Sequence, residues 1–531
     1  MRGVRGRAPG AVLVAVLAAT LAFVGCGGSD EGSAKKTFSV YIAEPQHLIP
    51  GNCQEGNGIA VISGLFEGLT QLVPGKGVQM DVAKSVTSKD KKTWTIKLKK
   101  GRTFHNGEKV TSKSFVDAWN AAAYAPNAWV NNYFFANIKG YDALNPKSGK
   151  PKTKKMSGLK IVDDYTFKVT LNAPFSQFPL TLAYTGFDPL PQVAFKNFDK
   201  FEEAPIGNGP FEMVGKWKHD QGITLKAYDK YVGPREPESD GVEFKIYSSP
   251  ETGYEDLIAG NLDIDDQIPP AKLNDAKAQL GDRYATEPSS SLHYLGFPVY
   301  DKRWQDPRLR HAISMAIDRN AINKAIYNGA YAPADSYISP IVPGYRKGAC
   351  GKWCEFHPDQ ARQLLKKAGG WDGAMTIWYA QDAYPDNELQ AIANQLKKTL
   401  GIEVRLKKQL FAAYLDSIRA HTVHGPYRLD WGMDYPSPQN YLEPLYSTGG
   451  SSNRINYSNK AVDSYIAKGN RAPSINAGNK DYNKAEDVLI KQMPTAPLFF
   501  GQIQLGHSAD VTNVKEDALV GIYLWDVKVT G

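Results

Sequence analysis

Hydrophobic and polar positions follow two different periods along the chain, which predicts strands as well as helices. The period of two that is typical of half-buried strands appears in three segments, 93–99, 223–228 and 242–247. The last of these leads directly into a segment at 250–259, with Pro250 in its first turn and Gly260 just beyond its end. Proline at the start and glycine after the end are signals of a short helix.

The most regular helical pattern covers residues 307–328. Asp306 is expected to be the N-cap, apolar residues recur on one face, and Gly329 follows the last of them. We therefore expect one helix over this segment. Further helices are expected at 358–368 and 387–400, and further strands at 374–380 and 402–409. The whole pattern predicts a mixed α/β chain with more than one sheet.

The first 25 residues have the features of an export signal. Three arginines and no acid precede an uncharged apolar stretch at 11–24, which is too short to span a bilayer. Residues 23–26, Phe-Val-Gly-Cys, resemble the lipobox of bacterial lipoproteins, so Cys26 is expected to carry the lipid. An ordinary secretory signal cut elsewhere is the alternative. Residues 26–37 read as a flexible tether, which places the body outside the cytoplasm and holds it at the membrane by its anchor.

Composition places the remainder among globular proteins and gives no sign of nucleic-acid binding. The chain has 531 residues, of which 42% are hydrophobic and 22% charged. Its formal charge of +8 falls to +5 without the three arginines of the signal. No run of five or more basic residues occurs. A basic surface for nucleic acid is therefore not expected.

Three cysteines remain in the body of the chain. Cys350 and Cys354 are close enough in sequence to close a small disulfide loop in an oxidising compartment. A metal site is the alternative, but the C-x3-C spacing has only His357 nearby and no second cysteine pair. Cys53 is left as a free thiol or pairs with a group that the sequence does not identify.

The common catalytic motifs are absent from the sequence. There is no phosphate-binding G-x-x-x-x-G-K-[ST], no H-E-x-x-H, no G-x-S-x-G and no G-x-G-x-x-G after a strand. We therefore expect no enzyme, no cofactor and no metal. The chain is rich in aromatic residues, with 28 Tyr and 10 Trp, which bind ligands or pack in cores. Composition alone leaves an exported binding protein or a hydrolase.

An ordered series of motifs resembles the extracytoplasmic solute-binding proteins of family 5, the dipeptide- and oligopeptide-binding class that serves ABC importers. The segment at 65–69 reads Leu-Phe-Glu-Gly-Leu, and the segment at 207–211 reads Gly-Asn-Gly-Pro-Phe. Further matching segments follow in family order at 94–119, 257–263, 306–319 and 359–369. A single match of this kind is weak, but the ordered set covers the body from about residue 38 to its end.

The resemblance implies a two-lobed clamshell of the periplasmic-binding-protein type, with discontinuous lobes and a third domain. We expect lobe I to be built from 38–70, 204–297 and 499–531, an extra domain II from 71–203, and lobe III from 298–498. The ligand would be enclosed between the lobes.

The resemblance also implies an ammonium anchor for a peptide. Asp434, in the segment at 428–435, matches the aspartate that serves this role in oligopeptide-binding proteins, with a loop-capping aspartate as the alternative. Trp431 and Tyr435 would wall the pocket or pack in the core. Arg428 matches an arginine that meets the peptide carboxylate, and a structural ion pair is an equal alternative. Phe411 aligns with a pocket aromatic.

Four further residues are expected on the facing side of the cleft. Gln54 and Glu55 lie where relatives contact the peptide backbone, and Asn208 lies in a glycine-bracketed loop near the lobe crossing. Tyr133 is a weaker candidate. Ordinary loop roles are the alternative for each.

These expectations favour one function over two others. We expect a monomeric, lipid-anchored receptor that binds oligopeptides by hinge closure and delivers them to the permease subunits of an ABC transporter. A receptor for a metal chelate, a sugar or a signalling amine is the first alternative, because fold does not fix ligand. An exported hydrolase is the second. The sequence does not specify ligand length, affinity or the permease.

Overall fold

The structure is a computed structural model that describes residues 36–73, 75–381 and 383–530. The predicted signal at 1–25, Cys26 and all of the tether except residues 36 and 37 lie outside the described residues. Residues from Lys36 onward form one compact unit. No helix within the described part of the chain is long and apolar enough to cross a membrane.

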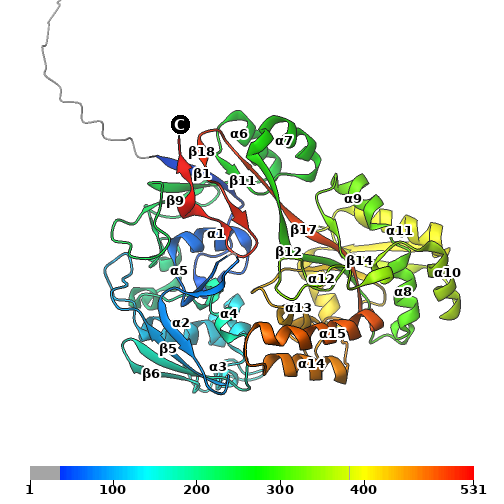
Figure 1. The fold of residues 1–531 in the computed structure, drawn as a ribbon, viewed down its shortest axis with the longest axis horizontal. Coiled ribbons are helices and arrows are strands. Elements are labelled where there is room, and N and C mark those ends of the chain that lie inside the picture. The colour runs from blue at the N-terminus through cyan, green and yellow to red at the C-terminus, as the bar shows by residue number, and fades with distance from the viewer. Residues whose placement is uncertain (1–35, 74, 382, 531) are drawn as a thin grey trace, which may run out of the picture. The chain divides into compact units, whose positions relative to one another are not determined.

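One large sheet runs through both lobes of this unit (Figure 1). The part of the sheet that defines the first lobe contains β1 (Thr37–Ile42), β8 (Phe211–Met213), β9 (Gly222–Ala227), β10 (Gly241–Ile246) and β11 (Ile264–Asp265). The part that defines the second lobe contains β14 (Met375–Ala380), β15 (Val404–Gln409) and β16 (Tyr427–Trp431). The first lobe is therefore built from segments far apart in sequence, whereas these three strands of the second lobe follow one another along the chain.

Two long strands join the lobes. β12 (Tyr284–Gly296) and β17 (Thr495–His507) pair antiparallel, with β11 beside β17 at one end and β16 beside β12 at the other. Their register shifts between Pro288 and Leu292, so the ladder is interrupted where the strands pass from one lobe to the other. Such an interruption bends the strand and weakens the pairing locally.

A separate four-stranded antiparallel sheet lies beside the first lobe (Figure 1). Its order is β4 (Ala83–Thr87), β5 (Thr93–Leu98), β7 (Thr166–Thr170) and β6 (Leu159–Asp163). Helix α2 (Ser112–Ala123) buries Trp119 in the same core, where its indole N–H donates to Phe187 O at 2.8 Å. This core is continuous with that of β1 and β10, so the four-stranded sheet and the first lobe share one hydrophobic cluster.

The helices complete the lobes. In the first lobe and the four-stranded domain they are α1 (Gly56–Leu65), α2, α3 (Tyr141–Leu144), α4 (Phe178–Thr181), α5 (Phe198–Glu202), α6 (Pro250–Ala259) and α7 (Leu273–Leu280). In the second lobe they are α8 (Pro307–Met315), α9 (Arg319–Tyr327), α10 (Pro358–Lys367), α11 (Asp386–Leu400), α12 (Phe411–Arg419), α13 (Pro438–Tyr446), α14 (Lys460–Asn470) and α15 (Asn479–Gln492).

Most predicted elements are confirmed to within two residues, and one is wrong. The expected helix over 307–328 is two helices, α8 and α9. Asp318 caps the second by accepting from Ala321 N at 3.0 Å, and the buried Arg319 donates to the carbonyl oxygens of Ser314, Ile317 and Pro497. Arg319 thus holds the break by two local hydrogen bonds and one long-range bond to Pro497, and an apolar period does not reveal that long-range bond.

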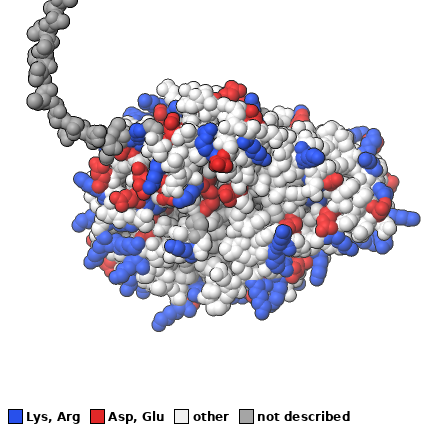
Figure 2. All heavy atoms as spheres, turned by 45° about the horizontal axis from the view of Figure 1, so that its top comes forward, with Lys and Arg blue, Asp and Glu red and all other residues white. Residues whose placement is uncertain are grey.

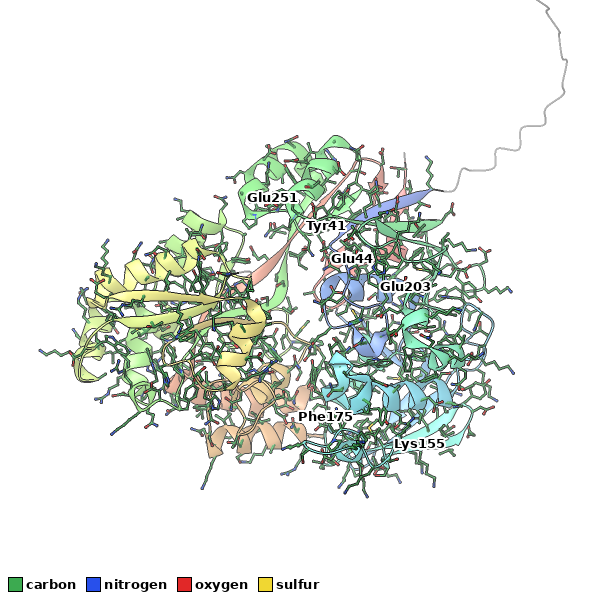
Figure 3. All side chains as sticks on the ribbon, turned by 180° about the vertical axis from the view of Figure 1, so that it is seen from behind. Tyr41, Glu44, Lys155, Phe175, Glu203 and Glu251 are labelled. Atoms are coloured by element: carbon green, nitrogen blue, oxygen red, sulfur yellow. A yellow bond between two sulfur atoms is a disulfide. The ribbon has the colours of Figure 1, made fainter. Side chains whose placement is uncertain are left out.

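The four-stranded domain also touches the second lobe. Ser176 N donates to Asn470 O at 2.7 Å, and Gln177 Nε2 donates to Ile475 O at 3.2 Å. Figure 3 shows the neighbouring Phe175 where this domain meets α14 and α15. The cleft between the lobes is therefore closed at this end by direct contacts.

The described body of the chain has one disulfide and one buried free thiol, and its surface carries charges of both signs. Cys350 and Cys354 form a disulfide with Cα atoms 5.7 Å apart, and Cys53 is a buried free thiol whose pKa is raised, chiefly by burial. Figure 2 shows Lys and Arg interspersed with Asp and Glu over one face of the molecule.

Candidate functional site

A cavity of about 330 Å³ lies between the lobes and is lined by both of them. The first lobe contributes β1, α1 and the residues after it, and the loop after β16 contributes residues 433–436. Residues 183–185 and Asp188 come from the four-stranded domain, and Glu516 and residues 518–522 from the C-terminal end of the chain. Sites for small ligands commonly have volumes of roughly 300–1,000 Å³, so the space fits a short chain molecule.

Asp434 lies in the loop between β16 and α13, and its carboxylate faces this cavity. Asn440, in the first turn of α13, binds both the backbone and the side chain of Asp434. Asp434 N donates to Asn440 Oδ1 at 2.8 Å, and Asn440 Nδ2 donates to Asp434 Oδ2 at 2.9 Å. Burial raises the pKa of Asp434 to about 6. No ion pair to Asp434 is found among the described residues. The arrangement presents an orientated carboxylate that lacks a cation.

One of the predicted facing residues, Tyr133, contacts Asp434 from the other side of the cleft, and a second, Gln54, contacts Tyr133; neither is among the residues that line the cavity. Gln54 Nε2 donates to Tyr133 Oη at 2.8 Å, and Tyr133 Oη lies 3.5 Å from Asp434 Oδ1, to which it donates. Burial raises the pKa of Tyr133, and the charge of Asp434 adds to the effect. The phenol therefore remains a protonated donor to the carboxylate. The chain Gln54–Tyr133–Asp434 connects the two sides of the cleft.

Tyr435 and Tyr184 flank Asp434 on the cavity wall. Tyr435 is buried, packs with the core of the first lobe although it follows a second-lobe strand, and donates to Gln439 Oε1. Tyr184, which the sequence interpretation missed, stacks on Phe134 with ring centroids 4.5 Å apart. No motif surrounds Tyr184, so only its place in the fold identifies it.

Arg428 does not line the cavity, so the structure argues against the expected contact with a ligand carboxylate. Its guanidinium is fully buried, with Nε 3.0 Å from Glu388 Oε1 and Nη1 donating to Leu429 O at 2.6 Å. Its guanidinium carbon Cζ also lies 4.5 Å from the ring centroid of Tyr384. The alternative role, a structural ion pair, is the one that the structure shows.

Four other predicted residues are not among those that line the cavity. Glu55 caps α1 by accepting from Asn57 N and Gly58 N, both at 2.7 Å. Asn208 is buried and binds the backbone of Glu67: its Oδ1 accepts from Glu67 N at 3.1 Å, and its Nδ2 donates to Glu67 O at 3.0 Å. Trp431 packs against two core clusters, and Phe411 begins α12 with 38% of its surface exposed. For Glu55, Asn208 and Trp431 the structural alternative describes the observed contacts, whereas for Phe411 the predicted role in the pocket stays a prediction.

The cavity floor contains a buried cluster of ion pairs that the sequence interpretation also missed. Arg235 pairs with Glu67 at 3.3 Å and with Asp81 at 3.5 Å, and Arg102 pairs with the same two acids at 3.2 and 3.5 Å. Burial raises the pKa of Asp81, and the neighbouring Glu67 raises it further. The negative charges of the two acids are balanced by the positive charges of the two arginines. The arginines come from separate loops, so no local pattern reveals the cluster.

Comparison with known families gives a match over most of the chain. The model for bacterial extracellular solute-binding proteins, family 5, matches residues 77–453. This range includes the four-stranded sheet, the crossing strand β12 and Asp434.

Individual relatives and solved structures agree with the family match. The chain is 28% identical over 500 residues to the oligopeptide-binding protein OppA of Bacillus subtilis strain 168, covering 90% of each. It is 26% identical over 474 residues to the periplasmic murein peptide-binding protein MppA of Escherichia coli K12, covering 86% of each. A structure of the murein tripeptide-binding protein MppA in its unliganded open form superposes with a TM-score of 0.78 at 23% identity, covering 94% of this chain and 98% of that one.

Proposed function

The chain belongs to the bacterial extracellular solute-binding proteins of family 5, and from this premise we propose that it is a receptor for oligopeptides that delivers them to an ABC permease. Asp434 carries the proposal, because its carboxylate faces the cavity between the lobes without a cation among the described residues. A free peptide brings an N-terminal ammonium, and a buried hydrogen-bonded charge pair contributes roughly 2–5 kcal/mol relative to its truncated form.

Binding would act through lobe closure about the two crossing strands. The interrupted ladder between Pro288 and Leu292 is the proposed hinge, since residues 289–291 of β12 have no paired residue on β17. A ligand that contacts Asp434 on one side and Tyr133 or Tyr184 on the other favours the closed state by its differential affinity. We propose that the domain boundaries 38–70 with 204–297 and 499–531, 71–203, and 298–498 follow this crossing.

The test compares free and N-acetylated forms of the same tripeptides. Titration calorimetry should detect binding of the free peptides and a loss of at least tenfold in affinity on acetylation. Asp434→Asn should weaken the free peptides to the level of the acetylated ones, while Asp416→Asn, an exposed aspartate of α12, should not. If acetylated and free peptides bind equally well, the ammonium anchor is refuted.

Delivery and anchoring need separate experiments. We propose that Cys26 carries a lipid and that the mature protein works as a monomer at the outer face of the cell membrane. Fatty-acid labelling should be lost in Cys26→Ser, with the protein then released from the membrane fraction. Deleting the cognate permease should abolish uptake of labelled peptide and leave binding by the receptor intact. Uptake that persists would contradict the delivery role.

The two alternative functions predict other results. Relatives of this chain include proteins named for glutathione and for deoxycholate, so membership of the family does not by itself fix the ligand. Arg235 is the only basic residue among the described residues that line the cavity, and it is already paired with Glu67 and Asp81. An anionic ligand without an amine would therefore find no free cation there. For a hydrolase, the peptide would be cleaved on long incubation, whereas a receptor returns it intact.

A further inference from the structure

Positive charge is concentrated in the four-stranded domain. Residues 71–203 contain 21 Lys and Arg against 11 Asp and Glu, an excess of ten, whereas the chain from residue 26 onward has an excess of only five. The rest of the chain is therefore net negative. Two of the 11 acids, Asp81 and Asp188, are buried, and so is the one arginine of the domain, Arg102. The surface of the domain consequently carries 20 lysines and nine acids.

The outer face of the four-stranded sheet carries lysines and hydroxyl groups. In β5 and β7 alternate residues are buried, and the residues between them, which include Lys97 and Lys168, point to the outer face. Lys160 of β6 lies directly opposite Lys168 and shares that face. All three lysines are exposed. The strand pairing adds six hydroxyl residues, Ser85, Thr87, Thr93, Thr95, Thr166 and Thr170. We call these nine residues the lysine face.

Acidic residues occur at the ends of the lysine face, in hairpin turns. Asp90 lies between β4 and β5, where its carboxylate accepts from the backbone N–H groups of residues 92 and 93 at 2.9 and 2.7 Å. Asp163 ends β6 opposite Thr166, and its carboxylate accepts from Tyr165 N at 2.8 Å. Both carboxylates are therefore used to close turns, and the nine residues of the face include no negative charge.

No ion pair of the described chain neutralises the lysines of this face. Lys113 with Asp117 is the single ion pair that a lysine of residues 71–203 forms with another described residue. Lys160 and Lys168 are like charges on directly opposed residues, an arrangement that lowers the stability of an antiparallel pair. The sheet therefore bears a repulsion that a bound anion would relieve.

Further lysines extend this charge beyond the sheet. The turn at 89–92 contains three of them, residues 99–100 two, and the segment at 152–155 before β6 another three. Figure 3 shows Lys155 of the last group at the outer end of the domain. A lysine ammonium is a compact point charge without the fork of a guanidinium, which recognises a single phosphate or carboxylate with two hydrogen bonds. A broad array of lysines therefore suits a surface that carries many anions.

The domain lies on the same side of the molecule as the start of the described chain. Figure 1 shows β1, β5 and β6 on the side away from β14 of the second lobe, and the view from behind in Figure 3 agrees. Cys26, the proposed site of the lipid, precedes Lys36 by ten residues. Ten residues span at most about 35 Å, so a lipid at Cys26 would keep this side of the body close to the bilayer.

From the charge and the position of this face we propose that the lysine face docks on a bilayer containing anionic phospholipids. The inference goes beyond the proposed function: it uses the proposed membrane anchor but not the identity of the ligand. A single acyl chain holds a protein only marginally, and a basic surface supplies the second contribution. Docking by this domain would leave the second lobe, on the opposite side of the cleft, free to move about the proposed hinge.

The test uses the mature chain from residue 26 without its lipid, as Cys26→Ser, so that only the protein surface contributes. Co-sedimentation would compare vesicles of phosphatidylcholine alone with a 70:30 mixture of phosphatidylcholine and phosphatidylglycerol. We expect at least tenfold stronger partitioning onto the anionic vesicles. This preference should fall steeply between 50 and 500 mM salt, because salt screens charges at a surface.

A triple variant locates the contact. Each lysine near an anionic bilayer contributes about fivefold in partitioning, so Lys97→Gln with Lys160→Gln and Lys168→Gln should lower it by at least about twentyfold. The corresponding Lys→Arg triple variant keeps the charge and should keep the binding. The matched control, which replaces three exposed lysines of α10 and α11 in the second lobe by Gln, should change partitioning less than threefold: Lys366, Lys367 and Lys398.

Two further measurements check that the triple Gln variant is intact. It should unfold at the same temperature as the wild type or higher, since the Lys160–Lys168 repulsion is removed. Its affinity for a free tripeptide should be unchanged, because none of the three lysines lines the cavity. The vesicle assay contains no peptide, so a chain that binds no peptide would refute the receptor and leave this inference standing.

Four results would overturn the inference. Equal partitioning onto neutral and anionic vesicles would exclude an electrostatic contact with lipid. An equal loss in the second-lobe control would assign the effect to net charge and not to this face. Binding to soluble polyphosphate without binding to vesicles would identify a polyanion in solution as the partner. A dimer in sedimentation velocity that the triple Gln variant dissociates, again without vesicle binding, would identify a second copy of this chain.

Discussion

Replacing Asp434 with Asn should strengthen the folded protein while weakening its binding. Burial holds the pKa of Asp434 at about 6 instead of its usual 3.8. Because the folded-state pKa lies above the unfolded one, the stabilising effect of the protonated carboxyl is complete below pH 3.8 and is lost as the pH rises through 6. At pH 7.5 ionisation thus destabilises the unliganded protein by at most about 3 kcal/mol, at roughly 1.4 kcal/mol per pKa unit.

The same carboxylate gives peptide binding a pH optimum. Below pH 6 the affinity should fall about tenfold per pH unit as Asp434 is protonated, and above about pH 8 it should fall as the peptide α-amino group loses its proton. Other cavity carboxyl groups, Asp81 and Asp266 among them, also have raised pKa values. The contribution of Asp434 is therefore the difference between the wild-type profile and that of Asp434→Asn.

Urea unfolding of the unliganded protein and calorimetry with one free tripeptide, each from pH 4.5 to 8.5, measure both effects. Asp434→Asn should be more stable than the wild type at pH 7.5 and only slightly more stable at pH 4.5. It should also lose most of the acid limb, which is the fall in peptide affinity below pH 6. Asp416→Asn is the matched control, because its carboxylate is exposed and pairs with Arg419 on the same helix. A variant that is less stable than the wild type at pH 7.5, or one that keeps the full acid limb, would refute the reasoning.

Three further predictions concern other parts of the structure. Arg428→Met should lower the free energy of unfolding by about 3–5 kcal/mol in urea titrations, because its buried carboxylate partner is left unpaired, and unchanged stability would contradict the ion pair. Reducing the Cys350–Cys354 disulfide, or replacing both cysteines with alanine, should lower the free energy of unfolding by about 2 kcal/mol, because the closed loop is short. Thermal unfolding with and without reductant measures this loss. If reductant still destabilised the double variant, the effect would not come from this disulfide. Tyr133→Phe should move the acid limb of peptide binding to higher pH, since the phenol hydrogen bond lowers the pKa of Asp434, and a shift to lower pH would be inconsistent with that bond.

Local pattern was sufficient to predict most of the regular elements and to single out Asp434, which lines the cavity. The helix α6 begins and ends where Pro250 and Gly260 predict, and Gly260 has the positive φ of 78° that favours glycine. Asp434 could be found because it lies in a short segment that resembles a known motif. Capping and periodicity are properties of neighbouring residues, so they are readable without the fold.

The break after Ala316 and the role of Arg428 could not be read in this way. Arg319 ends α8 and begins α9 by hydrogen bonding to the carbonyl of Pro497, which is far away in sequence. Arg428 is one residue of a regular strand, and only the packing of α11 beneath it supplies Glu388 as its partner. In both cases a long-range contact decided between two locally acceptable alternatives.

The sequence by itself determined the family, the alternation of strands and helices, and the position of Asp434, because each depends on residues that are close along the chain. The tertiary structure decided what surrounds Asp434. Asp188, Asp266 and Glu516 stand in three distant segments with no common motif, and only the packing of the four-stranded domain, the first lobe and the C-terminal hairpin brings them to one cavity. The charge of a binding site is a sum over groups that folding assembles, so it is a property of the fold and not of any one segment.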